Sequence, residues 1–150
     1  MQEKSIYECY EEIRRKTEEL CDKSITDSGL SKGAFIVLWT LYDFGRPCTQ
    51  KEICEVWHEN KQTVNSAVKK LVEEGIIDIA VSPENQREKL LTFTEKGRFL
   101  SMRTVGKLFV AEKRAFDRLL EEEQKEAVRI SKKYYEILKE EFDSVKGEKK

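Results

Sequence analysis

Histidine, proline and long apolar runs are scarce in this chain, and each scarcity excludes a class of protein. The 150 residues include one histidine, two prolines and four cysteines. The cysteines, at separations of 12, 27 and 6 residues, do not pair with His58 in any spacing typical of a metal site. There is also no glycine-rich phosphate loop and no plausible catalytic constellation. We therefore expect a protein that is not an enzyme and that holds no metal or cofactor.

Composition also bounds the location and the architecture. No apolar run is long enough to span a membrane, and the first residues, MQEKSIYECYEEIRRK, lack the apolar stretch of a signal peptide. We therefore expect a cytoplasmic protein without a membrane partner, its thiols reduced by default. Hydrophobic residues make up 39% of the chain and charged residues 38%. This balance suits a helical protein with a modest core that buries further apolar surface in a dimer.

Two helix signals lie close together in the middle of the chain. Thr49-Gln50-Lys51-Glu52 is a capping box, in which the Thr hydroxyl and the Glu carboxylate accept from each other's backbone N–H groups. We expect Ile53, Val56 and Trp57 to face the core from this first helix. After a four-residue break, Asn60 supplies the N-cap of a second helix. This order is that of a helix-turn-helix.

The second helix has one apolar face and one basic, amide-rich face. Apolar side chains recur at helical spacing at Val64, Ala67, Val68, Leu71 and Val72. The opposite side carries Gln62, Asn65, Ser66 and Lys69, flanked by Lys61, Thr63 and Lys70. Residues 60–72 hold three lysines and no acid, whereas the whole chain has a net charge of −1. Such a face suits phosphates and adenine edges, although most amphipathic helices simply face solvent.

A β-hairpin is predicted directly after this helix. Gly75 ends the helix, residues 76–81 are strand-like, residues 82–86 have turn chemistry, and residues 88–93 form a returning strand. Arg87, beside the tip, favours a wing that places an arginine in a DNA minor groove. The alternative is a structural β-ribbon. Residues 46–48 are predicted to add a short strand alongside.

Three motifs in this region resemble the MarR family of bacterial transcription regulators. They are TQKEI, NKQTVNSAVKKLVEEGII and PENQREKLLTFTEKG, which together cover about residues 49–97. The resemblance implies groove and phosphate contacts at Lys61, Gln62, Thr63, Asn65 and Ser66. It also implies that Arg87 is the wing-tip arginine, beside Asn85, where the family usually has an aspartate that holds it. Lys69 and Lys70 join the expected DNA contacts through their charge.

Amphipathic helices flank this region. We predict helices over residues 5–23, from Ser31 to Gly45, from Thr94 to about 119, and over about 121–145. Apolar faces at both ends of the chain need a partner, and the simplest is a second copy related by a two-fold axis. The alternative is an intramolecular bundle. The expected fold is mainly α with a small β-hairpin wing: a winged helix-turn-helix lobe over 31–98, with dimerisation helices over 1–30 and 99–150.

Two sensory devices are conceivable in such a protein. Tyr10, Trp39 and Tyr42 are candidates for an aromatic effector pocket, since relatives in the resembled family bind small phenolic compounds nearby. Aromatic residues at helical spacing are more often part of a core. Cys9 lies in the helix in which one branch of that family carries a peroxide-sensing cysteine. The surrounding acids Glu8, Glu11 and Glu12 oppose thiolate formation, so a plain reduced thiol is the alternative.

These features together predict a sequence-specific transcription regulator, and the resemblance to the MarR family implies a repressor. It would bind double-stranded DNA at an inverted repeat as a homodimer, with helix 60–74 in the major groove. A small aromatic ligand or thiol oxidation would modulate it. The alternative is a winged-helix module for protein–protein contact without DNA, because a fold alone does not fix a function.

Overall fold

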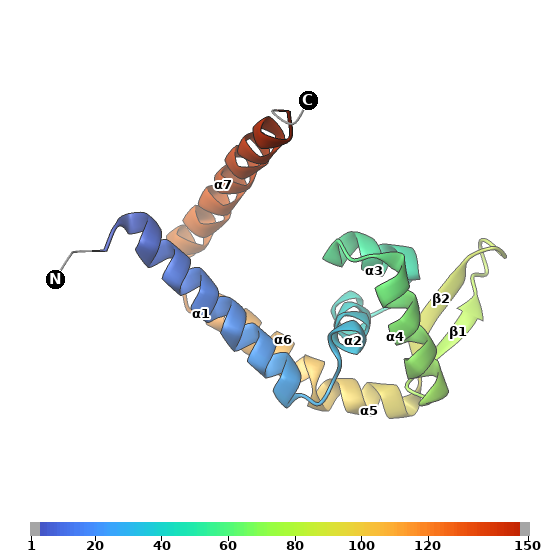
Figure 1. Ribbon diagram of the computed structural model, residues 1–150. Coiled ribbons are helices and arrows are strands. Elements are labelled where there is room, and N and C mark those ends of the chain that lie inside the picture. The colour runs from blue at the N-terminus through green and yellow to red at the C-terminus, as the bar shows by residue number, and fades with distance from the viewer. Residues whose placement is uncertain (1–3, 148–150) are drawn as a thin grey trace. The chain divides into compact units, whose positions relative to one another are not determined.

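The computed structural model describes residues 4–147, which form seven helices and one two-stranded sheet (Figure 1). The elements are α1 (Ile6–Asp27), α2 (Lys32–Phe44), α3 (Gln50–Trp57), α4 (Lys61–Glu73), β1 (Ile77–Val81), β2 (Lys89–Phe93), α5 (Glu95–Arg103), α6 (Val105–Asp117) and α7 (Glu121–Gly147). The chain divides into two compact units, residues 1–109 and 110–150. The mainly helical fold with one β-hairpin is the predicted class.

Helix starts follow local sequence signals closely. Ser31 caps α2 and accepts from the Ala34 N–H, and Thr49 and Glu52 form both halves of the predicted capping box on α3. Asn60 caps α4 by accepting from the Thr63 N–H at 2.8 Å. Thr94 caps α5 in the same way. In each case a side-chain oxygen satisfies a backbone N–H that has no partner within its own helix.

Two predicted boundaries are wrong. The first helix extends four residues beyond the predicted end and reaches Asp27. The predicted continuous helix from Thr94 to about residue 119 is broken at Thr104, whose φ of −116° and ψ of −95° are not helical. Gly106 lies against the Tyr42 ring just after this break, where an added Cβ would come within 2.8 Å of a ring carbon. The break thus accompanies a tertiary contact that helical periodicity does not encode.

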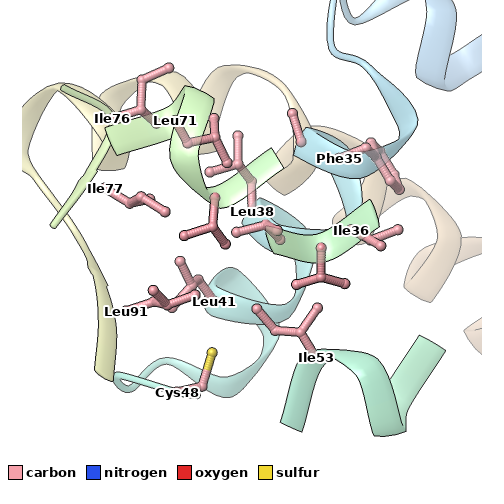
Figure 2. Packing of buried hydrophobic residues seen from close by; sticks show 14 of the residues in the cluster. Phe35, Ile36, Leu38, Leu41, Cys48, Ile53, Leu71, Ile76, Ile77 and Leu91 are labelled. Carbon is pink, nitrogen blue, oxygen red and sulfur yellow. The ribbon is translucent and has the colours of Figure 1, made fainter. Parts of the chain in front are cut away.

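The core lies where α2, α4 and the hairpin meet (Figure 2). α2 is its centre, since Val37 and Leu38 are fully buried and Ile36 nearly so. α4 packs on α2 and α3 through the predicted stripe, with Val64, Val68 and Leu71 at 2% exposure or less. Gly33 of α2 permits a close approach, because a Cβ there would lie 2.9 Å from that of Ala67. This packing fixes which face of α4 remains outside.

Two apolar side chains predicted to face the core do not. Val56 of α3 is 51% exposed and Val72 of α4 is 37% exposed. Both lie at the edge of an apolar stripe, where the neighbouring element decides burial. Trp57 is partly buried as expected, and its indole N–H donates to Thr40 Oγ1 at 2.8 Å. The break between α3 and α4 spans three residues rather than four, with His58 left-handed at φ 50°.

The hairpin pairs β1 and β2 antiparallel, with Ile77 opposite Phe93 and Val81 opposite Lys89. Gly75, at φ 68°, turns the chain from α4 toward β1 as predicted. The strand predicted over residues 46–48 is reduced to one bridge, in which Cys48 exchanges backbone hydrogen bonds with Leu91. This bridge joins the loop that precedes α3 to strand β2 of the hairpin.

α1 and α7 differ from these elements because neither has a buried residue. On α1, Ile6, Ile13 and Leu20 are 91%, 66% and 66% exposed. On α7, exposed apolar side chains include Val128, Ile130, Tyr135, Ile137, Phe142 and Val145. No helix among the described residues is long and apolar enough to cross a membrane.

Candidate nucleic-acid interface

The polar face of α4 is open to solvent. Val64, Val68 and Leu71 anchor the helix on its inner side, so the residues about half a turn away point outward. Seven of the eight residues predicted to contact DNA lie on this helix: Lys61, Gln62, Thr63, Asn65, Ser66, Lys69 and Lys70. Six are exposed, and Thr63 is half-buried, with its side-chain methyl 3.9 Å from where a Cβ on Gly33 of α2 would lie.

The charge of this face is not fully neutralised by the protein itself. Lys70 Nζ lies 3.9 Å from Glu74 Oε1, so its charge is partly balanced. Within residues 4–147, the side chains of Lys61 and Lys69 form no ion pair and no hydrogen bond. The N-terminal end of α4 adds backbone N–H groups and the positive end of the helix dipole. The face therefore presents two lysines and a helix N-terminus that can attract an anion.

A groove beside α4 adds residues that the sequence interpretation did not assign. It has a volume of about 480 Å³ and is lined from α4 by Lys61, Gln62 and Asn65. The α3 side contributes Gln50, Lys51 and Cys54. The sequence identifies Gln50 and Lys51 only as the middle residues of the Thr49–Glu52 capping box. The outward positions of that box are the signal that could have identified them, because residues just inside a cap and away from the core face solvent.

A cluster around Arg46 fixes the start of α3 and hence the α3 side of the groove. Arg46 Nη2 donates to Glu52 Oε1 at 2.8 Å, and its guanidinium lies 4.7 Å from the centre of the Phe44 ring. Glu52 Oε2 accepts from the Thr49 backbone N–H at 2.8 Å. The hydrogen bonds from Arg46 and then from Thr49 lower the pKa of Glu52. The carboxylate thus remains ionised and joins the α2–α3 loop to the helix cap.

The wing ends in a tight turn that leaves Arg87 exposed. Ser82 N–H donates to the Glu88 carbonyl at 2.8 Å, and Glu88 N–H donates to the Asn85 carbonyl at 2.9 Å. Asn85 Oδ1 accepts from the Arg87 backbone N–H at 3.1 Å. Asn85 therefore orders the backbone at Arg87, while within the described chain the guanidinium has no hydrogen-bond or ion-pair partner.

The candidate effector residues are only partly brought together. The rings of Trp39 and Tyr42 both lie against Phe109, with centroids at 5.4 and 5.6 Å. Trp39 also contacts Phe35 and Trp57, so it belongs to an aromatic cluster at the edge of the core. Tyr10 lies on α1 and is 43% exposed.

The four cysteines differ in exposure, and Cys54 is half-buried. Cys9, the redox candidate, and Cys21 are exposed on α1. Cys48 is completely buried, and burial raises the pKa of its thiol to about 12. Such a thiol is unreactive, because the thiolate is the nucleophile. Among residues 4–147, no group of three or more His, Cys, Asp or Glu side chains is placed to hold a metal.

Comparison with known proteins agrees with this geometry. The chain is similar in structure to a MarR family regulator from Neisseria meningitidis, NMB1585, with a TM-score of 0.70 and 23% identity over 89% of this chain and 96% of that one. MepR of S. aureus in complex with DNA gives a TM-score of 0.68 and 18% identity, over 89% and 96% of the two chains. No curated protein sequence matches the chain.

A third similar structure is BpsR of Bordetella bronchiseptica, whose DNA binding is regulated by 6-hydroxynicotinic acid. It has a TM-score of 0.62 and 21% identity, and covers 88% of this chain and 94% of that one. The model of the MarR family matches residues 28–88, which run from the start of α2 through α4 to the wing. This stretch contains α2, α3, α4 and β1, and together with β2 it has the element order of a winged helix-turn-helix.

Proposed function

We propose that this protein is a transcription regulator that binds double-stranded DNA through the winged-helix lobe of residues 31–98. The observation that carries the proposal is the exposed face of α4, where Lys61 and Lys69 have no ion-pair partner among residues 4–147 and lie beside Gln62 and Asn65. In this proposal α4 enters the major groove. Its lysines supply salt-dependent affinity and its amides read base edges.

The groove and the wing extend the contact on either side of α4. Gln50 and Lys51 line the groove that α4 shares with α3, so they would reach the DNA backbone beside it. Arg87, exposed at the end of the hairpin, would enter the adjacent minor groove. MepR, a protein of similar fold, has been captured on DNA, and this supports the assignment.

A homodimer is the second part of the proposal. The apolar side chains of α1 and α7 are exposed in the single chain, and a second copy is the partner that every molecule of the protein has available. In this arrangement residues 1–30 and 99–150 form the dimerisation region. Two copies of α4 would then read half-sites about 34–36 Å apart in an inverted repeat, as a repressor of this type would.

Regulation is the third part. A small aromatic ligand near Tyr10, Trp39 and Tyr42, or oxidation of Cys9, would shift the dimer between arrangements that differ in DNA affinity. BpsR, similar in fold, responds to an aromatic acid, which supports the ligand route. For oxidation, the exposure of Cys9 is the supporting feature.

The test is an unbiased selection of DNA sequences by the purified protein at two salt concentrations. We expect enrichment of an inverted repeat and a steep loss of affinity with salt. A control protein with Lys61 and Lys69 both changed to Glu should enrich nothing. Recovery of unrelated sequences by both proteins would contradict the proposal.

A second function is favoured by one observation on the wing. Ile79 and Val81 of β1 are 43% and 58% exposed, and such aliphatic side chains are typical of protein contacts. A winged-helix module for protein–protein contact would use this strand and would leave the lysine face unused. It would bind its partner equally well after Lys61 and Lys69 are changed to Glu.

A further inference from the structure

The turn between α3 and α4 is held by hydrogen bonds from residues outside the proposed DNA contacts. Among residues 4–147, His58 is the only non-glycine residue with a left-handed backbone, at φ 50°. Its N–H and the N–H of Glu59 both donate to the Cys54 carbonyl, the second at 3.1 Å. A left-handed backbone is unfavourable for a residue with a Cβ, so these bonds stabilise a conformation that the turn would otherwise leave. The turn is therefore fixed to the end of α3.

Glu59 continues this network into the start of α4. Its Oε1 accepts from the Asn60 backbone N–H at 3.0 Å and from the Asn60 side-chain Nδ2 at 3.2 Å. Asn60 Oδ1 in turn accepts from the Thr63 N–H at 2.8 Å. Because carboxylate oxygens accept hydrogen bonds and do not donate them, Glu59 selects the amide orientation in which Nδ2 faces it and Oδ1 faces Thr63. Glu59 thus holds the Asn60 cap in the orientation that satisfies Thr63.

The first turn of α4 carries side chains on which the proposed base reading depends. Lys61 and Gln62 directly follow the cap, whereas Lys69 lies about two turns further along the helix. In helix-turn-helix proteins the N-terminal residues of the recognition helix contact base edges. Hydrogen bonds to those edges need donor–acceptor distances of about 2.7–3.2 Å. A loose first turn would therefore impair base reading by Gln62 before it changed the contribution of Lys69.

We propose that Glu59 is a positioning residue for α4: it holds the Asn60 cap, and thereby the first turn, where Gln62 can read a base edge. The proposal rests on the DNA-binding function proposed above. Glu59 acts through Asn60, since it does not line the groove that α4 shares with α3. Its negative charge lies two residues before Lys61 and opposes the approach of phosphates to all sequences alike. Its hydrogen bonds, by contrast, favour the sequence that Gln62 reads.

The test compares Glu59→Ala with Glu59→Gln in the full chain. Glu59→Gln keeps an Oε1 that can accept from Asn60 and loses the charge, whereas Glu59→Ala loses both. Competition binding to the selected operator and to its single substitutions measures discrimination. At the base pairs that depend on Gln62, Glu59→Ala should lose discrimination about fivefold and Glu59→Gln should retain it. Affinity for unrelated DNA should rise equally in both variants, because each loses the same charge.

Two further variants separate positioning from a general loss of stability. In a Gln62→Ala background, Glu59→Ala should cost no further discrimination, because the residue through which it acts is absent. Glu73→Ala removes an exposed acid from the other end of α4, one that has no ion-pair or hydrogen-bond partner within residues 4–147. It should keep discrimination within about twofold of the wild type. Additive losses in the double variant, or equal losses in Glu59→Ala and Glu59→Gln, would overturn the proposal.

Amide hydrogen exchange of the DNA-free protein, followed by NMR, distinguishes a failure of this proposal from a failure of DNA binding. The Thr63 N–H should exchange about fivefold faster in Glu59→Ala than in the wild type, and at the wild-type rate in Glu59→Gln. If the wild type prefers no DNA sequence while the exchange follows this pattern, the DNA-binding function fails and the positioning of α4 by Glu59 stands. If the wild type prefers a sequence while Glu59→Ala leaves the exchange unchanged, the positioning role is overturned.

Discussion

The winged-helix lobe and the terminal helices contrast sharply in burial. Every buried hydrophobic residue of the described chain lies between Ala34 and Val105, whereas α1 and α7 have none. Yet α1 is as well capped as any helix of the lobe, with Ser5 and Glu8 forming a complete capping box. The difference teaches that local signals define where a helix begins, while burial decides whether it contributes to a core.

The interactions that stabilise each region also differ: α1 has surface ion pairs, whereas the lobe has a buried apolar core. On α1, Arg14 pairs with Glu11 and Glu18, and Lys23 pairs with Asp27 at 2.9 Å. Exposed pairs at this spacing contribute little to stability, because water and salt screen their attraction. In the lobe, each fully buried leucine or isoleucine contributes roughly 1.5–3 kcal/mol. The lobe is therefore stabilised mainly by its core, whereas α1 and α7 bury no residue within the chain.

The largest expected effect is the loss of the proposed dimer after a substitution in the terminal helix α1. Ile13→Glu places a charge on the exposed apolar face of α1. In the proposed dimer this charge would be buried without a partner, at a cost of roughly 3–5 kcal/mol. Analytical ultracentrifugation should detect monomers at concentrations where the wild type is dimeric. Glu19→Ala, at a polar position of the same helix, should leave the mass unchanged, and a dimeric Ile13→Glu protein would contradict the interface.

The next effect lies in the lobe. Leu38 is fully buried, so Leu38→Ala should lower the free energy of unfolding by about 2–5 kcal/mol. Urea denaturation measures the change, and the loss should be the same at different protein concentrations. Ile137→Ala, on the exposed face of α7, serves as the comparison. Its effect should vary with concentration, and a loss independent of concentration would show that α7 is part of a core within one chain.

Base reading should depend on α4. Gln62→Ala should reduce discrimination at one or two base pairs by about 1–3 kcal/mol each, because the amide contacts base edges in the proposed complex. Competition binding to operator variants with single substitutions measures this loss. If all sequences weaken equally, Gln62 contacts the backbone instead.

Phosphate contacts should show smaller and uniform effects. Lys69→Ala should weaken binding to all sequences alike and reduce the salt slope by about one. Lys133→Ala, which removes an exposed lysine from α7, is the matched control and should leave both quantities unchanged. A salt slope that falls equally in the two variants would mean that the terminal helices also contact DNA.

The smallest expected effect is the pH dependence of the free energy of unfolding. The pKa of Glu52 is lowered from its ordinary value of 4.5, so the ionised carboxylate stabilises the folded state. This contribution is complete above pH 4.5 and is lost as the pH falls through the pKa of the folded protein. Urea denaturation from pH 7 to about pH 3 should show the wild type losing its advantage over Glu52→Gln in that acidic range. A difference that stays constant would exclude the Arg46–Glu52 pair as its source.

Much of the lobe follows from short-range patterns. The caps at Ser31, Thr49 and Asn60 and the left-handed Gly75 are predictable because each involves groups within a few residues of each other. The same patterns misplace Val56 and Val72, because burial at the edge of a stripe depends on the element beside it. They also extend one helix through Thr104, since only packing around Gly106 and Tyr42 distinguishes that position.

The candidate nucleic-acid interface is likewise only partly predictable from the sequence. Helical periodicity alone places Gln62, Asn65 and Lys69 opposite the apolar stripe of α4, and the structure leaves all three exposed. It does not predict that Gln50 and Lys51 share a groove with them, because that depends on how α3 packs against α4.

The sequence by itself determined the order of the elements, the positions of the caps, the polar face of α4 and the basic character of that face. These features depend on residues close together in the chain, where backbone geometry fixes the distances. Tertiary structure alone decided the break at Thr104, the groove between α3 and α4, and the burial of Cys48. Each of these joins residues far apart in sequence, and their distances exist only once the core has packed.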